Sequence, residues 1–269
     1  MLVGDTHGTA PSSRERVPGW PKTYVVHPRV AVGICGASAL DYAAIVGLIS
    51  SACAAYGGAW NDDFLAMLER ELPPGLSCAL TSSGDMRRAA KLAEAEGPLS
   101  LLVLVASDDG PIAARFLTAP TPDRVAVEQD FARPLEGRAE LTMIGRTEYV
   151  VTHVLEAPEL LEEVLAFESR RVRDVAFAEA LALARTIHSR ADMTHVPIDV
   201  IRDRFARIEL PVGWIGGPLT GVFVGAGGAR NLTDDELQQT KEQVMAGSTL
   251  LSGAVSAYKT YTTLTPPKK

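Results

Sequence analysis

The feature that most limits the fold is the order of two hydrophobic patterns along the chain: the alternation typical of strands and the spacing typical of helices. Residues 22–34 are rich in β-branched residues that alternate around His27-Pro28-Arg29, which predicts two strands joined by a tight turn. Residues 38–56 carry apolar side chains at helical spacing. Further helices, strands, two more helices and a last group of strands follow. Runs of strands and runs of helices that do not strictly alternate indicate a layered α+β fold.

Capping residues and turn residues define the individual elements. Ser38, Asn61 and Thr233 are expected N-caps, and Pro73-Pro74-Gly75 is expected to stop a helix. Gly225 to Gly228 predict a glycine turn rather than a phosphate loop, because no Lys-Ser/Thr pair follows them. The expected helices span 38–56, 61–72, 85–96, 158–170, 175–188 and 231–259, and the expected strands 1–3, 22–34, 76–81, 99–106, 112–118, 125–127, 141–144 and 198–201.

Composition excludes several classes of partner. The 269 residues carry a net charge of −7 without a basic stripe, which argues against a nucleic-acid partner. The longest apolar run, residues 101–106, is too short to span a bilayer, and no signal peptide precedes Asp5.

The three cysteines have no Cys-x-x-Cys spacing, which fits a reducing, cytoplasmic compartment. Each lies in an apolar stretch, which predicts a buried thiol. No histidine pairs with another ligand at metal-binding spacing, so neither a metal nor another cofactor is expected.

A set of spacings near the N-terminus carries chemical information. The segment Gly4-Asp5-Thr6-His7-Gly8-Thr9 is followed by Lys22, seventeen positions after Asp5, and by Gly36, fourteen positions after Lys22. This pattern resembles the β-subunits of proteasome-type N-terminal-nucleophile (Ntn) hydrolases. In that family, a strand that ends in a small residue and a glycine leads into a helix at the position of Gly36. The family's nucleophile-bearing first strand has no counterpart in residues 1–269.

Two later segments extend the resemblance to residues 1–205. Residues 101–118 look like the family's central hairpin with its acidic Gly-Pro turn, and residues 179–199 look like its helix that ends in an aspartate and a hydroxyl residue. The resemblance implies a four-layer α-β-β-α sandwich in a ring or another homo-oligomer. Residues 206–269 are expected to form a C-terminal extension of glycine-rich turns and a terminal helix.

The resemblance also implies roles for individual residues, carried over by matched position. Lys22 would lower the pKa of an N-terminal nucleophile, and Asp5 would hold that lysine charged. The backbone N–H of Gly36 would stabilise the oxyanion. The remaining matches are Asp192 and Thr194, which would support the N-terminal amine, and Thr9 and Cys35, which would contact an extended peptide substrate.

These roles leave alternative functions open. In the first, a nucleophile outside residues 1–269 makes the protein a threonine-type peptidase or amide hydrolase that acts on peptides or proteins. In the second, the chain is a non-catalytic structural or binding subunit related to proteasomes. A third is an unrelated α+β binding protein. Retention of Asp5, Lys22 and Gly36 favours the first, because a scaffold alone has little need for a lysine–carboxylate pair.

Overall fold

The computed structural model describes the chain as two compact units. The residues described are 1–6, 8–9, 16–17, 20–36, 38–134, 157–171, 174–191 and 217–238. The first unit comprises Met1–Gly4, Pro21–Leu135 and Thr220–Leu232, and the second Asp5–Trp20, Glu136–Leu219 and Thr233–Lys269.

A five-stranded antiparallel sheet forms the centre of the first unit. Its strands follow the order of the chain, and each pairs with the next. The predicted strands at 22–34, 99–106 and 112–118 are confirmed, and the strand predicted at 125–127 is longer than expected. The sheet consists of β4 (Thr23–His27), β5 (Val30–Cys35), β6 (Leu99–Ser107), β7 (Gly110–Pro120) and β8 (Val125–Pro134).

Strand β6 is buried along almost its whole length. Every residue from Leu99 to Ala106 is buried, and Leu101, Val103 and Val105 are 0% exposed. Successive side chains of a strand point to opposite faces. A layer must therefore cover each face of this sheet, which is unusual for an antiparallel sheet, since such sheets often leave one face to solvent.

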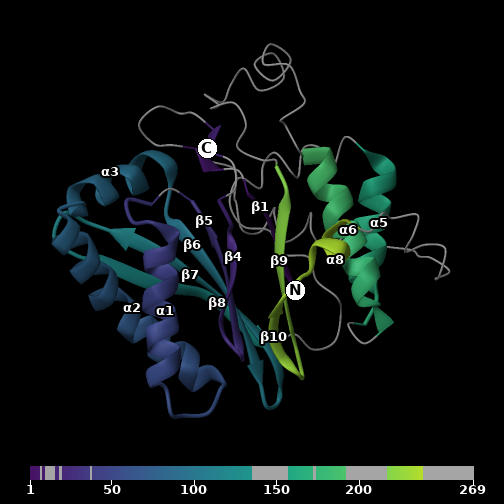
Figure 1. Ribbon diagram of the computed structural model, residues 1–269, viewed down its shortest axis with the longest axis horizontal. Coiled ribbons are helices and arrows are strands. Elements are labelled where there is room, and N and C mark those ends of the chain that lie inside the picture. Colours follow the sequence, from purple (N-terminus) through teal and green to yellow (C-terminus); the bar gives the residue numbers. More distant parts are fainter. Residues whose placement is uncertain are drawn as a thin grey trace, which may run out of the picture. The chain divides into compact units, whose positions relative to one another are not determined.

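Three helices cover one of these faces (Figure 1). They are α1 (Tyr42–Ala55), α2 (Asp62–Ser83) and α3 (Met86–Glu96), which contact β4, β8 and β7 respectively. Each turns a stripe of buried side chains toward the sheet, such as Ile45 and Ile49 of α1. The expected helix at 85–96 is confirmed.

Helix α2 corrects the prediction that Pro73-Pro74-Gly75 ends a helix and that a strand follows at 76–81. The helix continues to Ser83 because its buried stripe of Leu68, Leu72, Leu76 and Leu80 runs unbroken at i, i+4 spacing across the prolines. A proline inside a helix costs about 3 kcal/mol. Each buried leucine stabilises by about 1.5–3 kcal/mol, so packing outweighs the local signal.

The start of α1 also differs from the prediction. Asp41, rather than Ser38, caps the helix, and its Oδ1 accepts a hydrogen bond from the Ala43 N–H at 3.0 Å. Ser38 instead accepts from the Leu40 N–H at 3.1 Å in the loop before the helix. Both residues are good caps, and the choice between them depends on where the chain turns after Gly36. The predicted cap Asn61 of α2 is confirmed.

A second sheet packs against the other face of the central sheet at β4, β5 and β6. It contains β1 (Leu2–Asp5), β9 (Leu219–Gly225) and β10 (Gly228–Asn231), and β10 contacts β4, β5 and β6 (Figure 1). The predicted glycine turn is confirmed at the tip of the β9–β10 hairpin. There Gly228 has φ +102°, and a Cβ on it would lie 2.4 Å from the Pro28 carbonyl oxygen. The first unit therefore stacks helices, sheet and sheet in that order.

The second unit contains a pair of helices that pack on each other. Helices α5 (Pro158–Ser169) and α6 (Phe177–Ala191) bury Leu160 and Val164 against Leu183 and Ile187. Both helices were predicted. The short helix α8 (Asp234–Gln238) contacts α6 and begins at the predicted cap Thr233, which exchanges hydrogen bonds with Glu236.

The rest of the described second unit includes a small strand pair, β2 (Gly8–Thr9) with β3 (Arg16–Val17). The elements predicted at 141–144 and 198–201, and most of the helix predicted at 231–259, lie outside the described residues. The domain boundary at residue 205 stays a prediction. Among the helices of the described residues, none is long and apolar enough to cross a membrane.

Candidate functional site

Two residues of the predicted pattern lie together at one end of the first unit. A Cβ built on Gly4 of β1 would lie 3.4 Å from the Cβ of Lys22 and 3.4 Å from Cγ2 of Thr23. Lys22 in turn pairs with β5, because the Ile34 N–H donates to the Lys22 carbonyl oxygen at 2.8 Å. Gly36 follows two residues after Ile34. Gly4 and Lys22, far apart in the sequence, are thus neighbours, and Lys22 lies beside the strand that ends before Gly36.

Two threonine hydroxyls join the strands at this end. Thr23 Oγ1 donates to Thr220 Oγ1 at 3.1 Å, and Thr220 Oγ1 lies 3.5 Å from the Gly4 carbonyl oxygen, to which it donates. Side chains from β4 and β9 and the backbone of β1 are thereby linked. Sequence reasoning did not find Thr23 or Thr220, since nothing in a single sequence connects positions 197 residues apart.

Gly36 has a conformation and a packing that suit glycine alone. Its φ is +113°, and a Cβ would lie 3.1 Å from both the Leu99 Cα and the Pro98 carbonyl oxygen. The Tyr42 hydroxyl donates to the Gly36 carbonyl oxygen at 2.6 Å. This hydrogen bond holds the Gly36 carbonyl. The Gly36 N–H, which the proposed oxyanion role would use, belongs to the preceding peptide, directly after Cys35 at the end of β5.

Cys35 lies beside Gly36 at the end of β5 and is half-buried. It is the cross-strand partner of Ser100 on β6, so the thiol and the hydroxyl share one face of the sheet. Ser100 is 8% exposed, and its Oγ has no hydrogen-bond partner among the described residues. A buried hydroxyl without a hydrogen-bond partner is uncommon. Ser100 therefore places an unusual polar group in the core of the sheet, close to Gly36.

The other predicted site residues lie in the second unit or outside the described residues, except Cys35. Asp5 is half-buried at the end of β1 and belongs to the second unit, so its ion pair with Lys22 stays a prediction. Thr9 lies in β2, where it pairs with Arg16. Asp192 and Thr194 lie outside the described residues.

The cysteines have three different environments, and none forms a disulfide. Cys53 is buried as predicted, and burial raises the pKa of its thiol from 9.0 to about 12, which makes it unreactive at neutral pH. The prediction that Cys78 is buried is wrong, since it lies on the exposed side of α2. Within the described part of the chain, no group of three His, Cys, Asp or Glu side chains could hold a metal ion.

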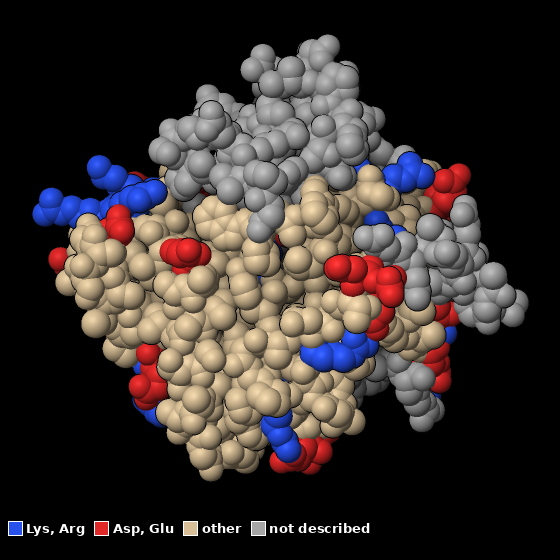
Figure 2. All heavy atoms as spheres, in the orientation of Figure 1, with Lys and Arg blue, Asp and Glu red and all other residues tan. Residues whose placement is uncertain are grey.

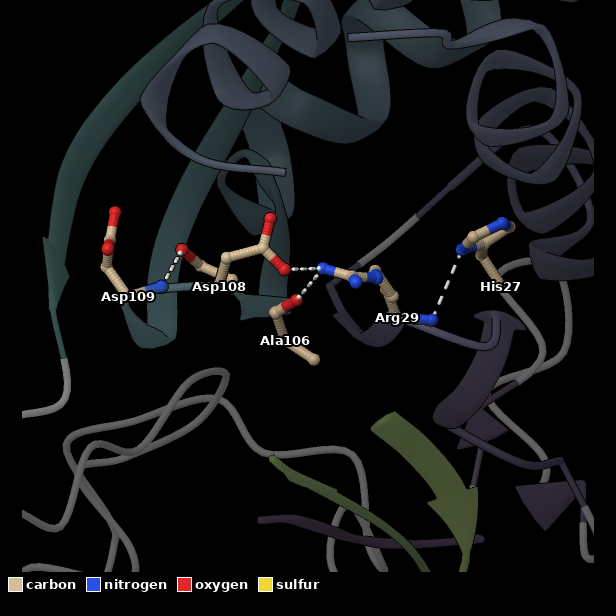
Figure 3. Close-up of polar contacts among 6 residues, drawn as sticks. His27, Arg29, Ala106, Asp108 and Asp109 are labelled. Atoms are coloured by element: carbon tan, nitrogen blue, oxygen red, sulfur yellow. Dashed lines mark hydrogen bonds and ion pairs between the residues drawn. The ribbon is translucent and has the colours of Figure 1, made fainter. Parts of the chain in front are cut away.

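A second polar cluster lies at the opposite end of β5 (Figure 3). The guanidinium of Arg29 contacts Asp108 Oδ1 at 2.5 Å and donates to the Ala106 carbonyl oxygen at 3.3 Å. The Arg29 N–H donates to His27 Nδ1 at 3.2 Å, and the His27 ring stacks on Trp60 with 4.4 Å between centroids. The cluster joins the β4–β5 turn to the β6–β7 turn. Because Arg29 and Asp108 are largely exposed, their ion pair contributes at most about 1 kcal/mol.

Comparison with known proteins adds no family to this geometry. No protein-family model matches the chain, and no curated protein matches it. The spacings, the strand pairing and the glycine geometry are therefore what supports a function.

We expect Gly36→Ala to destabilise the protein by about 1–3 kcal/mol, because the new Cβ meets backbone atoms and the positive φ is strained. Urea unfolding measures this. The matched control is Gly47→Ala at an exposed position of α1, where a Cβ meets nothing within 4 Å and should stabilise the helix by about 0.5–1 kcal/mol. Equal effects of the two substitutions would contradict the packing described at Gly36.

The stack of His27 on Trp60 predicts a pH dependence. Burial, with a smaller contribution from the Arg29 cation, lowers the pKa of His27 below 6.5. Stability from this site is therefore complete above about pH 6.5 and falls as the pH drops toward the folded-state pKa. NMR titration of the His27 ring measures that pKa directly. Arg29→Gln should raise it part of the way to 6.5, whereas Arg70→Gln, at an exposed position of α2, should leave it unchanged. A His27 pKa at or above 6.5 in the unaltered protein would refute this electrostatic assignment.

Proposed function

We propose that this protein belongs to the proteasome-type Ntn hydrolases and acts as a threonine-type peptidase or amide hydrolase. Its nucleophile would lie on a strand N-terminal to Met1. The observation that carries the proposal is the contact of Gly4 with Lys22, on a strand paired to the one that leads into Gly36. The spacing of Gly4, Lys22 and Gly36 in the sequence does not by itself require this proximity, so the proximity is a separate observation in support of the proposal.

The proposed chemistry assigns one step to each residue. The hydroxyl of an N-terminal threonine attacks a peptide carbonyl carbon, and the threonine's own amine takes the hydroxyl proton. The Lys22 cation favours the developing alkoxide electrostatically. The Gly36 N–H donates to the oxyanion of the tetrahedral intermediate. The amine then returns its proton to the leaving group, and water hydrolyses the acyl-enzyme by the same steps. Asp5 keeps Lys22 charged and oriented.

The layers of the first unit support the fold that this function requires. Its helices, central sheet and second sheet match three layers of an α-β-β-α sandwich in order. The packed pair α5–α6 comes between β8 and β9 in the chain, where the resemblance expects the helices of the fourth layer. We propose that these helices complete the sandwich.

The location and the assembly are part of the same proposal. Three cysteines without a disulfide suit the cytoplasm. A ring or another homo-oligomer, expected from the resemblance, would restrict the site to peptides or unfolded protein.

The proposal is tested by covalent labelling of the protein purified from its source. A peptide β-lactone or vinyl sulfone should add once, at an N-terminal Thr, Ser or Cys that precedes residues 1–269, as tandem mass spectrometry would locate. Lys22→Ala should slow labelling by about 10²–10⁴-fold, with partial recovery in Lys22→Arg. Arg29→Ala, at the opposite end of β5, is the control and should label at the normal rate.

Two outcomes would contradict the hydrolase. One is a native polypeptide that starts at Met1 and takes no label. The other is labelling that Lys22→Ala leaves unchanged. The first outcome would favour the non-catalytic structural or binding subunit.

A further inference from the structure

An open groove of about 730 Å³ lies between α3 and the end of β7, within the first unit. This volume is in the range of small-molecule sites. The groove is separate from the contacts among Gly4, Lys22 and Ile34. Its apolar lining consists chiefly of Ala90, Ala93, Pro98, Ala119, Pro120 and Pro122.

The lining is short and rigid. Alanine and proline side chains have almost no rotamer freedom to lose when a ligand covers them. The groove therefore needs little reorganisation to accept an apolar chain, and the free-energy cost of ordering side chains on binding is small.

One buried polar side chain opens into this apolar surface. Thr118 is 4% exposed and lines both the groove and a second, smaller pocket of about 30 Å³.

The rim of the groove is cationic. Arg87 and Lys91 both line it and lie one helical turn apart on α3. Figure 2 shows Lys and Arg side chains projecting from the molecule where α3 lies in Figure 1. Glu94 lines the groove as well, so two cations oppose one carboxylate. Arg88, the neighbouring cation, does not line the groove and pairs with Asp85 at 3.7 Å.

From these contacts we infer that the groove binds a medium-chain aliphatic carboxylate. Its carboxylate lies between Arg87 and Lys91, and its hydrocarbon chain lies along the alanine and proline floor toward Thr118. The charge of the rim selects the anionic head group, and the floor selects a chain without bulky branches. This binding does not depend on the proposed hydrolase activity.

The test is calorimetric titration of the full chain with decanoate below its critical micelle concentration. We expect saturable one-to-one binding that tightens about fourfold per methylene from hexanoate to decanoate. Decanol and decylamine, which share the chain but not the anionic head, should bind at least about tenfold more weakly.

Variants locate the site. Arg87→Gln with Lys91→Gln should weaken decanoate binding by at least about tenfold, and Ala119→Trp, which fills the groove from an exposed position, should abolish it. Arg88→Gln removes the same charge one residue away and should change nothing. Circular dichroism and the unfolding midpoint verify that each variant is folded. Binding that survives the double substitution, equal binding of decylamine, or no saturation below about 1 mM would overturn the inference.

Discussion

Burial of β5 and β6 on both faces is the constraint on which the rest of the first unit depends. From Val30 to Ile34 and from Leu99 to Ala106 each side chain is buried, whichever way it points. Leaving their apolar surface in water would cost about 25 cal/mol per Å². These strands are therefore stable only between two covering layers. Helices α1 to α3 supply one layer, and the sheet that contains the β9–β10 hairpin supplies the other. The hairpin comes from a part of the chain almost 200 residues later than β4.

This constraint also explains the position of the candidate site. Covering the second face brings β1 and β9 against β4, and the Thr23–Thr220 hydrogen bond and the close approach of Gly4 to Lys22 follow from that docking. Gly36 lies where β5 must leave the sheet beside Pro98 and Leu99 to start α1. The residues that the spacings selected are thus those at which layers meet or the chain turns sharply.

The sequence predicted the elements whose signals are local. The strands of the central sheet, the helices at 85–96, 158–170 and 175–188 and the glycine turn at 225–228 all carry their own period or turn residues. It failed where packing competes with a local signal: α2 continues through Pro73 and Pro74 because Leu72 and Leu76 lie on one buried stripe. It also chose Ser38 over Asp41 as a cap, because both are good caps and only the path after Gly36 decides between them.

The site could be predicted only in part for a related reason. The spacings identified Lys22 and Gly36, but the partners that hold them, Thr23, Thr220 and Tyr42, are found only once the strands and the α1 loop are in place. The pairing of Cys35 with Ser100 likewise depends on the register of β5 and β6. No residue type marks such partners in a single sequence.

A crystal structure of the purified protein is the most direct test of the proposed Ntn architecture. A four-layer sandwich predicts that α5 and α6 pack on the face of the β1–β9–β10 sheet that points away from β4, β5 and β6. The Lys22 ammonium and the Asp5 carboxylate should then form an ion pair beside Gly4. Packing of α5 and α6 elsewhere, with that sheet face open or covered by another element, would contradict the proposed architecture and the hydrolase with it.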